Sequence, residues 1–274
     1  MTRRILPAIG LATVALATAL HAPAHPWLSR QAAGGGQASQ ARTPRSLAPL
    51  DLTGYWVSVV TEDWRFRMIV PDKGDYSSVP LTPDGRKVAD SWDPAKDQAD
   101  GSQCRSYGAA GLLRIPGRLH IFWENDSTLR VDTDSGTQTR LLHFGVLSSQ
   151  LLAAPQWQGY SLASWEGMRP AVSRTSLIQD DPRANAPEGY LKVMTTRMKP
   201  GYLRKNGVPY SANAVLEEYF DSFQEHNGDV WLVVTSIVTD PEYLTQPFIT
   251  STHFKKLSSA AGWDPTLCRA NQPR

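Results

Sequence analysis

The sequence predicts an all-β fold with a minor helical part, an antiparallel barrel of about eight to ten strands with one short helix. Three observations favour this fold. Runs rich in Val, Ile, Thr and aromatic residues alternate with polar positions, and clusters of Asn, Asp, Ser and Gly separate several of these runs. The chain of 274 residues is also long enough for one large β domain of roughly 225 residues behind a leader.

The leader has the order of a secretory signal peptide. Arg3 and Arg4 precede an apolar run over residues 5–20, and Ala22-Pro23-Ala24 follows as a small-x-small cleavage pattern. A retained membrane anchor is the alternative, but the run is short for a spanning helix of about 20 residues. The arginine pair also matches the start of a twin-arginine signal, without the rest of that motif.

These features divide the chain into three parts. We expect residues 1–24 to be a signal peptide, residues 25–49 a flexible linker and residues 50–274 a single barrel domain. The 28 Lys and Arg against 26 Asp and Glu give a formal charge of +2, and the signal peptide holds two of the arginines. The mature chain is therefore formally neutral, which argues against a nucleic-acid partner. The expected location is the periplasm or the exterior, without stable membrane insertion after signal cleavage.

The cysteines support export. Cys104 and Cys268 are the two cysteines of the chain, and an even pair in an exported protein predicts a disulfide. Two free thiols or a metal-binding pair are the alternatives, but no CxxC spacing or clustered His favours a metal. The chain also lacks the GxGxxG, Walker, HExxH and GxSxG motifs, so we expect no cofactor.

The expected elements follow in order from the linker. A strand is predicted over residues 54–60, and residues 61–67 form a rim loop or a strand that points Trp64 and Phe66 inward. Thr82 followed by Pro83 predicts the start of the short helix, which ends near Ala89. Further strands are expected over residues 119–124, 128–133, 138–144, 190–196, 214–221, 230–239 and 248–256.

The first hairpins bring polar residues to one face. With a three-residue first loop, the apolar face carries Leu119, Ile121, Trp123, Leu129, Val131 and Thr133. With a two-residue second turn, the opposite face carries His120, Glu124, Arg130, Asp132 and His143. A register slip of one residue would place Arg140 there instead.

This polar face has two interpretations. It is the solvated outside of the sheet, where charged cross-strand pairs are ordinary. Alternatively it lines a barrel cavity in which His120 or His143, together with Glu124 or Glu218, performs acid–base chemistry near neutral pH.

Glu218 stands out because it is the one charge on an apolar strand face. Ala214, Leu216 and Phe220 share that face, and a carboxylate in such surroundings must be paired or must have a raised pKa. The sequence leaves three alternatives for Glu218: it faces a ligand, it forms a structural ion pair, or it is exposed to solvent. The arginines that could pair with it are Arg67, Arg130, Arg140 and Arg204.

The nine tryptophans provide candidate walls of a ligand site, because large aromatic rings commonly line small-molecule pockets. The candidate walls are Trp56, Trp64, Trp123 and Tyr219. The candidate polar groups are Arg67, Arg130, Arg140 and Glu218. Arg67 lies in the dense aromatic and charged segment over residues 61–67, where an Arg beside a Trp also makes ordinary structural contacts.

Two resemblances add to these patterns. Gly54-Tyr55-Trp56 resembles the Gly-x-Trp opening of lipocalin-like barrels, whose Trp closes one barrel end, often under an Arg from a late strand. Most of the mature chain also resembles a large, functionally uncharacterised group of exported proteins of environmental bacteria. The landmarks shared with that group are Gly54-Tyr55-Trp56, Pro80-Leu81-Thr82-Pro83-Asp84-Gly85, Cys104, Pro116-Gly117-Arg118, Gly159-Tyr160-Ser161, Trp165-Glu166-Gly167, Gly207-Val208-Pro209, Ser211, Glu218, Asp240-Pro241, Tyr243-Leu244 and Pro247. Residues 168–189 interrupt the pattern after Gly167. The second resemblance implies export and a β-rich fold, but no reaction.

Together these observations predict an exported protein that binds a small, partly apolar or aromatic molecule in its barrel. The alternative is a metal-independent lyase, hydratase or isomerase that uses the His and Glu residues above. A third interpretation is a module that binds a partner through the outside of the barrel.

Overall fold

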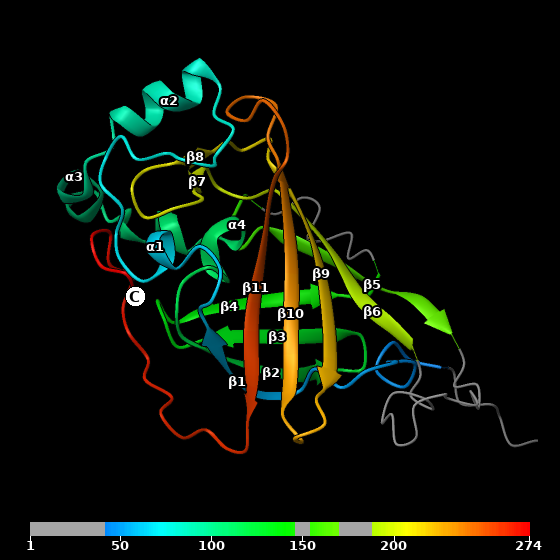
Figure 1. The fold of residues 1–274 in the computed structure, drawn as a ribbon. Helices are drawn as coiled ribbons and strands as arrows, with labels where there is room; N and C mark the ends of the chain where they lie inside the picture. Colours follow the sequence, from blue (N-terminus) through cyan, green and yellow to red (C-terminus); the bar gives the residue numbers. More distant parts are fainter. Residues whose placement is uncertain (1–41, 146–153, 170–187) are drawn as a thin grey trace, which may run out of the picture. The chain divides into compact units, whose positions relative to one another are not determined.

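Nine strands close into a barrel in the computed structural model, which describes residues 42–145, 154–169 and 188–274 (Figure 1). The strand order around the barrel is β1-β11-β10-β9-β6-β5-β4-β3-β2. The bounds are β1 (Gly54–Val59), β2 (Arg118–Asn125), β3 (Thr128–Thr133), β4 (Gln138–His143), β5 (Tyr160–Arg169), β6 (Glu188–Thr196), β9 (Val215–Gln224), β10 (Val230–Thr239) and β11 (Phe248–Leu257). The predicted β-barrel is confirmed, but the sheet is mixed.

The parallel contact between β4 and β5 corrects the expectation of a purely antiparallel barrel. Leu142 pairs with Ser161 and His143 with Leu162. Gln158 donates to Gln138 Oε1 at 3.0 Å, so the chain has returned to the starting end of β4 before it enters β5. Strand β5 was not expected from the sequence, because small Ser, Ala and Gly residues weaken its strand pattern.

The hairpin registers agree with the sequence analysis. In β2–β3, Leu119 pairs with Thr133 and Ile121 with Val131. In β3–β4, Thr128 pairs with His143, as expected for the two-residue turn. The apolar face points into the barrel, so the polar face predicted for these hairpins lies outside.

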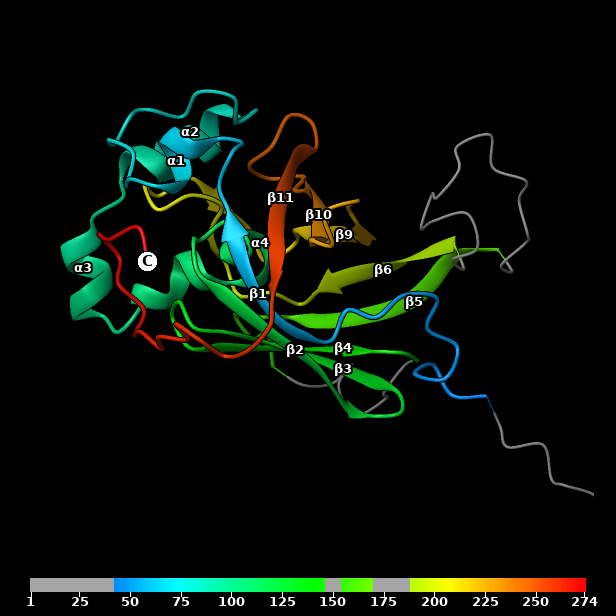
Figure 2. The same ribbon diagram turned by 60° about the horizontal axis from the view of Figure 1, so that its bottom comes forward.

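A cap of short elements covers one end of the barrel (Figures 1 and 2). It contains α1 (Trp64–Arg67), α2 (Pro83–Asp90), α3 (Pro94–Ala99), the 3₁₀ helix η1 (Gln103–Tyr107), α4 (Ala109–Leu112), β7 (Gly201–Tyr202) and β8 (Pro209–Tyr210). The predicted helix corresponds to α2, whose cap Thr82 accepts the Gly85 N–H at 3.0 Å. The expectation of one short helix is wrong because the other helices are too short to show a clear periodicity.

The two larger of three apolar clusters fill the barrel and the cap, with polar side chains between them. Trp56, Leu129 and Phe220 belong to the barrel cluster, and Leu216 and Phe248 to the cap cluster. Buried polar residues occupy inward positions of six strands at the boundary: Arg140, Ser161, Thr195, Glu218, Ser236 and Thr252. The barrel interior is therefore packed with side chains and crossed by a polar layer.

Part of the expected linker packs at the other end of the barrel. Trp165 Nε1 donates to the Pro44 carbonyl at 2.8 Å, and the Arg45 N–H donates to Asp126 O at 3.1 Å. Trp165 also contacts Trp123 at a ring-centroid distance of 6.4 Å. The expected signal peptide and residues 25–41 lie outside the described residues.

A disulfide connects the cap to the end of the chain. Cys104 in η1 is bonded to Cys268, 164 residues later, which confirms the predicted pairing. The bond fits a compartment that permits oxidation. Among the described residues, no helix has the length and apolar character needed to span a bilayer.

Candidate functional site

The predicted polar face is packed against other parts of the outer surface. His120 stacks on Tyr55 at a centroid distance of 4.1 Å, and it meets Trp263 edge to face at a centroid distance of 6.4 Å. Arg130 Nε donates to Asp132 at 2.9 Å. Its ring contacts with Tyr55 and Trp263 make His120 an aromatic packing residue, and burial lowers its pKa below the usual value.

The other predicted acid–base residues do not join His120 in a common cavity. His143 lies on the outer face, where its ring stacks on Tyr160 at 5.4 Å and burial lowers its pKa. Glu124 is exposed at a β-bulge and lies 3.7 Å from Arg130. Glu218 lies inside the barrel, on the other side of the sheet.

Glu218 forms an ion pair with Arg140 across the barrel interior. Arg140 Nη1 donates to Oε1 at 3.0 Å and Nη2 to Oε2 at 2.6 Å. Arg140 Nη2 also donates to Thr195 Oγ1 at 3.3 Å. Both charged side chains are 1% exposed. Of the alternatives for Glu218, the structural ion pair is the one observed, and the partner is Arg140.

The predicted aromatic walls lie in different places. Trp56 is buried in the barrel and donates through Nε1 to Leu52 O at 2.9 Å, with the Lys256 ammonium 5.3 Å from its ring. Trp123 lies at the barrel end opposite the cap, packed on the barrel cluster. Tyr219 is on the outer face and hydrogen-bonds to Glu217. These rings do not enclose one site.

The segment over residues 61–67 also differs from the inward-strand alternative. It forms helix α1, begun by Asp63 in the left-handed conformation with φ of 50°. This turn exposes 61% of Trp64 and buries Arg67. Arg67 binds Glu62 and donates through Nε to Arg114 O at 2.8 Å.

A cavity of about 280 Å³ lies in the cap, outside the barrel. Helices α2 and α3 border it, together with β7, β8 and the loop between β10 and β11. Its aromatic lining consists of Trp92, Tyr202, Tyr210 and Tyr243. Trp92 can pack here because residue 207 is glycine. A Cβ at Gly207 would lie 2.2 Å from the Trp92 Cβ, which is too close for any other residue.

A hydrogen-bonded charged group forms one wall of this cap cavity. Arg105 Nη1 donates to Asp97 Oδ1 at 3.1 Å and to the Tyr202 hydroxyl at 3.1 Å. Tyr202 in turn donates to Asp97 Oδ2 at 3.0 Å, and burial raises its pKa. The three side chains hold each other in place, so they present fixed polar groups beside the aromatic lining.

Several sequence landmarks meet around the cap cavity. Leu81 pairs with Leu244 in an isolated bridge, and Ser211 Oγ donates to Asp240 Oδ1 at 2.9 Å. The sequence does not show that these landmarks lie together, and the lining residues Trp92, Asp97, Arg105 and Tyr202 were not expected from it. The only available signals were Asp93-Pro94, which starts α3, and the adjacent Trp92.

The geometry separates a packed barrel from a cap that contains an open cavity with aromatic and polar walls. Glu218 and Arg140 form a structural ion pair inside the barrel, whereas Trp92, Arg105 and Tyr202 line the cap cavity. No protein-family model, curated protein or solved structure matches this chain.

Proposed function

We propose that this protein binds a small, partly apolar or aromatic molecule in the cap cavity. The observation that carries the proposal is a volume of about 280 Å³ walled by four aromatic rings. Small-molecule sites commonly combine such walls with a few fixed polar groups. Here the Asp97, Arg105 and Tyr202 group supplies the polar contacts.

The charges around the cavity favour a neutral or cationic ligand. Asp93, Asp97 and Asp100 line it against Lys96 and Arg105. Lys96 lies 3.2 Å from Asp100 and Arg105 lies 3.1 Å from Asp97, so one carboxylate remains without a cation among the lining residues. An anionic ligand would face this excess negative charge.

The barrel serves as the scaffold of the cap in this proposal. The closed strands and the buried Trp56 under Lys256 support a relation to lipocalin-like barrels, because a cation from the last strand covers the first-strand Trp. The ligand site is moved from the barrel to the cap. The disulfide and the signal-like leader support a periplasmic or secreted location.

Binding of three related phenols tests the proposal by calorimetry on the full mature chain. Tyramine is cationic, p-cresol is neutral and 4-hydroxyphenylacetate is anionic. We expect saturable binding of tyramine and p-cresol, and at least about tenfold weaker binding of the acid because of the excess carboxylate. If none of the three binds saturably, the proposal is wrong.

Variants then locate the site. Tyr243→Ala removes a half-buried wall and Tyr202→Phe removes one hydroxyl while retaining the ring. Both should weaken tyramine binding by at least about tenfold. Trp231→Leu is the control, because Trp231 lies on β10 outside the cavity lining. Equal binding by all these variants would place the ligand elsewhere and contradict the proposal.

A further inference from the structure

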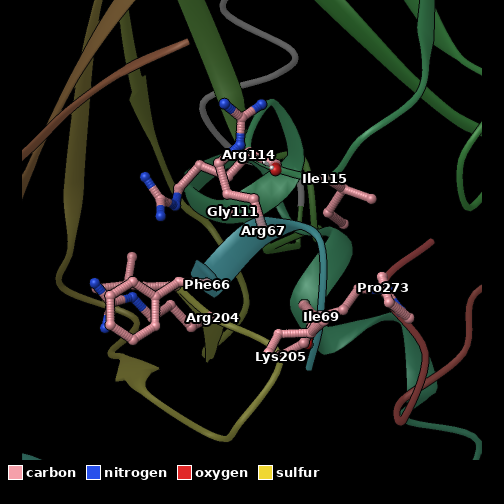
Figure 3. Close-up of a pocket in the computed structure, with 11 residues that line it drawn as sticks. Phe66, Arg67, Ile69, Gly111, Arg114, Ile115, Arg204, Lys205 and Pro273 are labelled. Atoms are coloured by element: carbon pink, nitrogen blue, oxygen red, sulfur yellow. Dashed lines mark hydrogen bonds between the residues drawn. The ribbon is translucent and has the colours of Figure 1, made fainter. Parts of the chain in front are cut away.

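Four buried cations line a second pocket, of about 20 Å³, on another side of the cap (Figure 3). We call Arg67, Arg114, Arg204 and Lys205 the arginine pocket. Their exposed fractions are 3%, 7%, 3% and 7%. Arg67 ends α1, Arg114 follows α4, and Arg204 and Lys205 lie between β7 and β8. Figure 3 shows Phe66 and Arg204 overlapping on one side of α1 and Ile69 and Pro273 on the other.

Two of these cations have a carboxylate partner. Arg67 binds Glu62, and Arg114 Nη2 lies 3.0 Å from Asp63 Oδ2. Glu62 also lies 3.2 Å from His253 Nδ1, so its charge is shared. These pairs neutralise about half of the cluster.

The other two cations contact only neutral groups within ion-pair distance among the described residues. Arg204 donates to Ser77 O at 2.7 Å and to Ser78 Oγ at 3.1 Å, and its guanidinium carbon lies 3.9 Å from the centre of the Phe66 ring. Lys205 Nζ donates to Gln272 O at 2.6 Å, and burial lowers its pKa to about 7, so the excess positive charge at neutral pH is carried mainly by Arg204. The arginine pocket therefore holds more positive than negative charge in a buried setting.

Three N–H-bearing nitrogens in the pocket also lack an acceptor. Arg67 Nη2, Arg114 Nη1 and Arg204 Nε are buried and have no hydrogen-bond partner in the described part of the chain. A buried guanidinium nitrogen without an acceptor costs free energy, and more so where the charge is not neutralised. The paired Arg140 also has one such nitrogen, so this feature alone does not indicate a ligand. Three of them in one cluster that also has an excess of positive charge indicate that a negatively charged group is missing from it.

We propose that the arginine pocket binds a small anion that completes this cluster. A volume of about 20 Å³ accommodates a group of about the size of one water molecule. The ligand is therefore a halide, or one terminal oxygen of a carboxylate or phosphate whose remainder stays outside. In either case a slight rotation of the guanidinium groups would let their unpartnered N–H groups donate hydrogen bonds to the bound anion.

Anion-dependent thermal unfolding of the full mature chain tests this proposal. Sodium chloride, sodium acetate and sodium phosphate are titrated separately, and the rise in Tm is fitted to a single site. The Arg204→Met variant should weaken the fitted affinity by at least about tenfold, because it removes one charged donor group. The control is Arg45→Met, which makes the same change of charge at an exposed arginine and should leave the affinity unchanged.

A second variant covers the case in which Arg204→Met does not fold. Glu62→Gln removes the carboxylate that competes for Arg67, so it should tighten anion binding severalfold. Saturation by chloride alone would identify a halide site, and saturation also by acetate or phosphate would identify a site for an oxyanion tip. If Tm rises equally in the wild type, Arg204→Met and Glu62→Gln, the anions act on the general surface and the proposal is wrong.

Discussion

The barrel and the cap both bury arginine side chains, but they neutralise them differently. In the barrel, Arg140 meets Glu218 in a two-bond ion pair with both side chains 1% exposed. In the cap, Arg67 and Arg114 have carboxylate partners, whereas Arg204 has two neutral acceptors. In the barrel, the buried positive charge is balanced by a carboxylate of the same chain. In the cap, the buried positive charge exceeds the negative charge of its carboxylate partners.

The difference shows how to distinguish a structural buried charge from a functional one. Burial alone is the same for Arg140 and Arg204. The balance of charges is what differs, because Arg140 Nε and Arg204 Nε are each buried without a hydrogen-bond partner in the described part of the chain. Proteins keep buried charges paired unless something else supplies the missing partner, so an excess points to a ligand.

The largest expected effect comes from breaking the barrel pair. Glu218→Gln leaves the Arg140 charge buried without a counter-charge, which should lower the free energy of unfolding by about 3–5 kcal/mol. Urea-induced unfolding followed by Trp fluorescence measures the change. A loss below about 1 kcal/mol would show that solvent reaches Arg140.

A double variant separates charge from packing in that prediction. Arg140→Met combined with Glu218→Leu removes both charges and fills much of the same volume, so it should recover most of the stability lost by Glu218→Gln. If the double variant is as unstable as the single one, the pair stabilises the barrel through its geometry and its bond to Thr195.

The disulfide is expected to have the next largest effect, and it acts on the cap side of the comparison. Replacing Cys104 and Cys268 by Ser should cost about 2–5 kcal/mol, since it releases a loop of 164 residues. The freed C-terminal segment includes Pro273, which lines the arginine pocket. The Tm response to chloride should therefore weaken as well. An unchanged response would show that the pocket does not depend on this segment.

These two regions also show what the sequence could predict. The hairpin pairings depend on local turns and on alternation, so the faces of Leu119, His120 and Ile121 followed from the sequence. Glu218 was recognised as unusual for the same reason. Its partner Arg140 could not be chosen from four arginines, because the contact crosses the barrel interior.

The cap was harder to predict, for a physical reason. Its helices are too short to carry a hydrophobic period, and each is held by tertiary contacts. Trp92, Tyr202 and Tyr243 form one cavity although about 150 residues separate the first from the last, and no local pattern records that they meet. In the strand alternative for residues 61–67, Arg67 points outward, whereas the helical turn begun by Asp63 buries it.

A smaller effect is expected from Arg204→Met in buffer without added anion. Arg140→Met would strand the Glu218 carboxylate, but Arg204 has no carboxylate partner to strand. The free energy of unfolding should therefore change by about 1 kcal/mol or less, in either direction, as lost hydrogen bonds oppose the removal of an uncompensated charge. A loss near 4 kcal/mol in urea unfolding would mean that Arg204 is neutralised within the chain, as Arg140 is.

The smallest effect should come from the two histidines on the outer face of the barrel as the pH is lowered. Burial lowers the pKa of His120 and His143 below the usual 6.5, so below that pH the unfolded chain binds protons that the folded chain does not. The contribution of the two histidines is therefore full above pH 6.5 and falls as the pH drops through the lowered folded values. Arg67 and Arg204, with pKa values lowered to about 10, stay charged throughout, whereas Lys205, with its pKa lowered to about 7, adds to the loss at the upper end of this range. Unfolding free energies between pH 7 and 5 should show this loss and a shallower slope in His143→Gln; an identical slope would exclude His143 as its source.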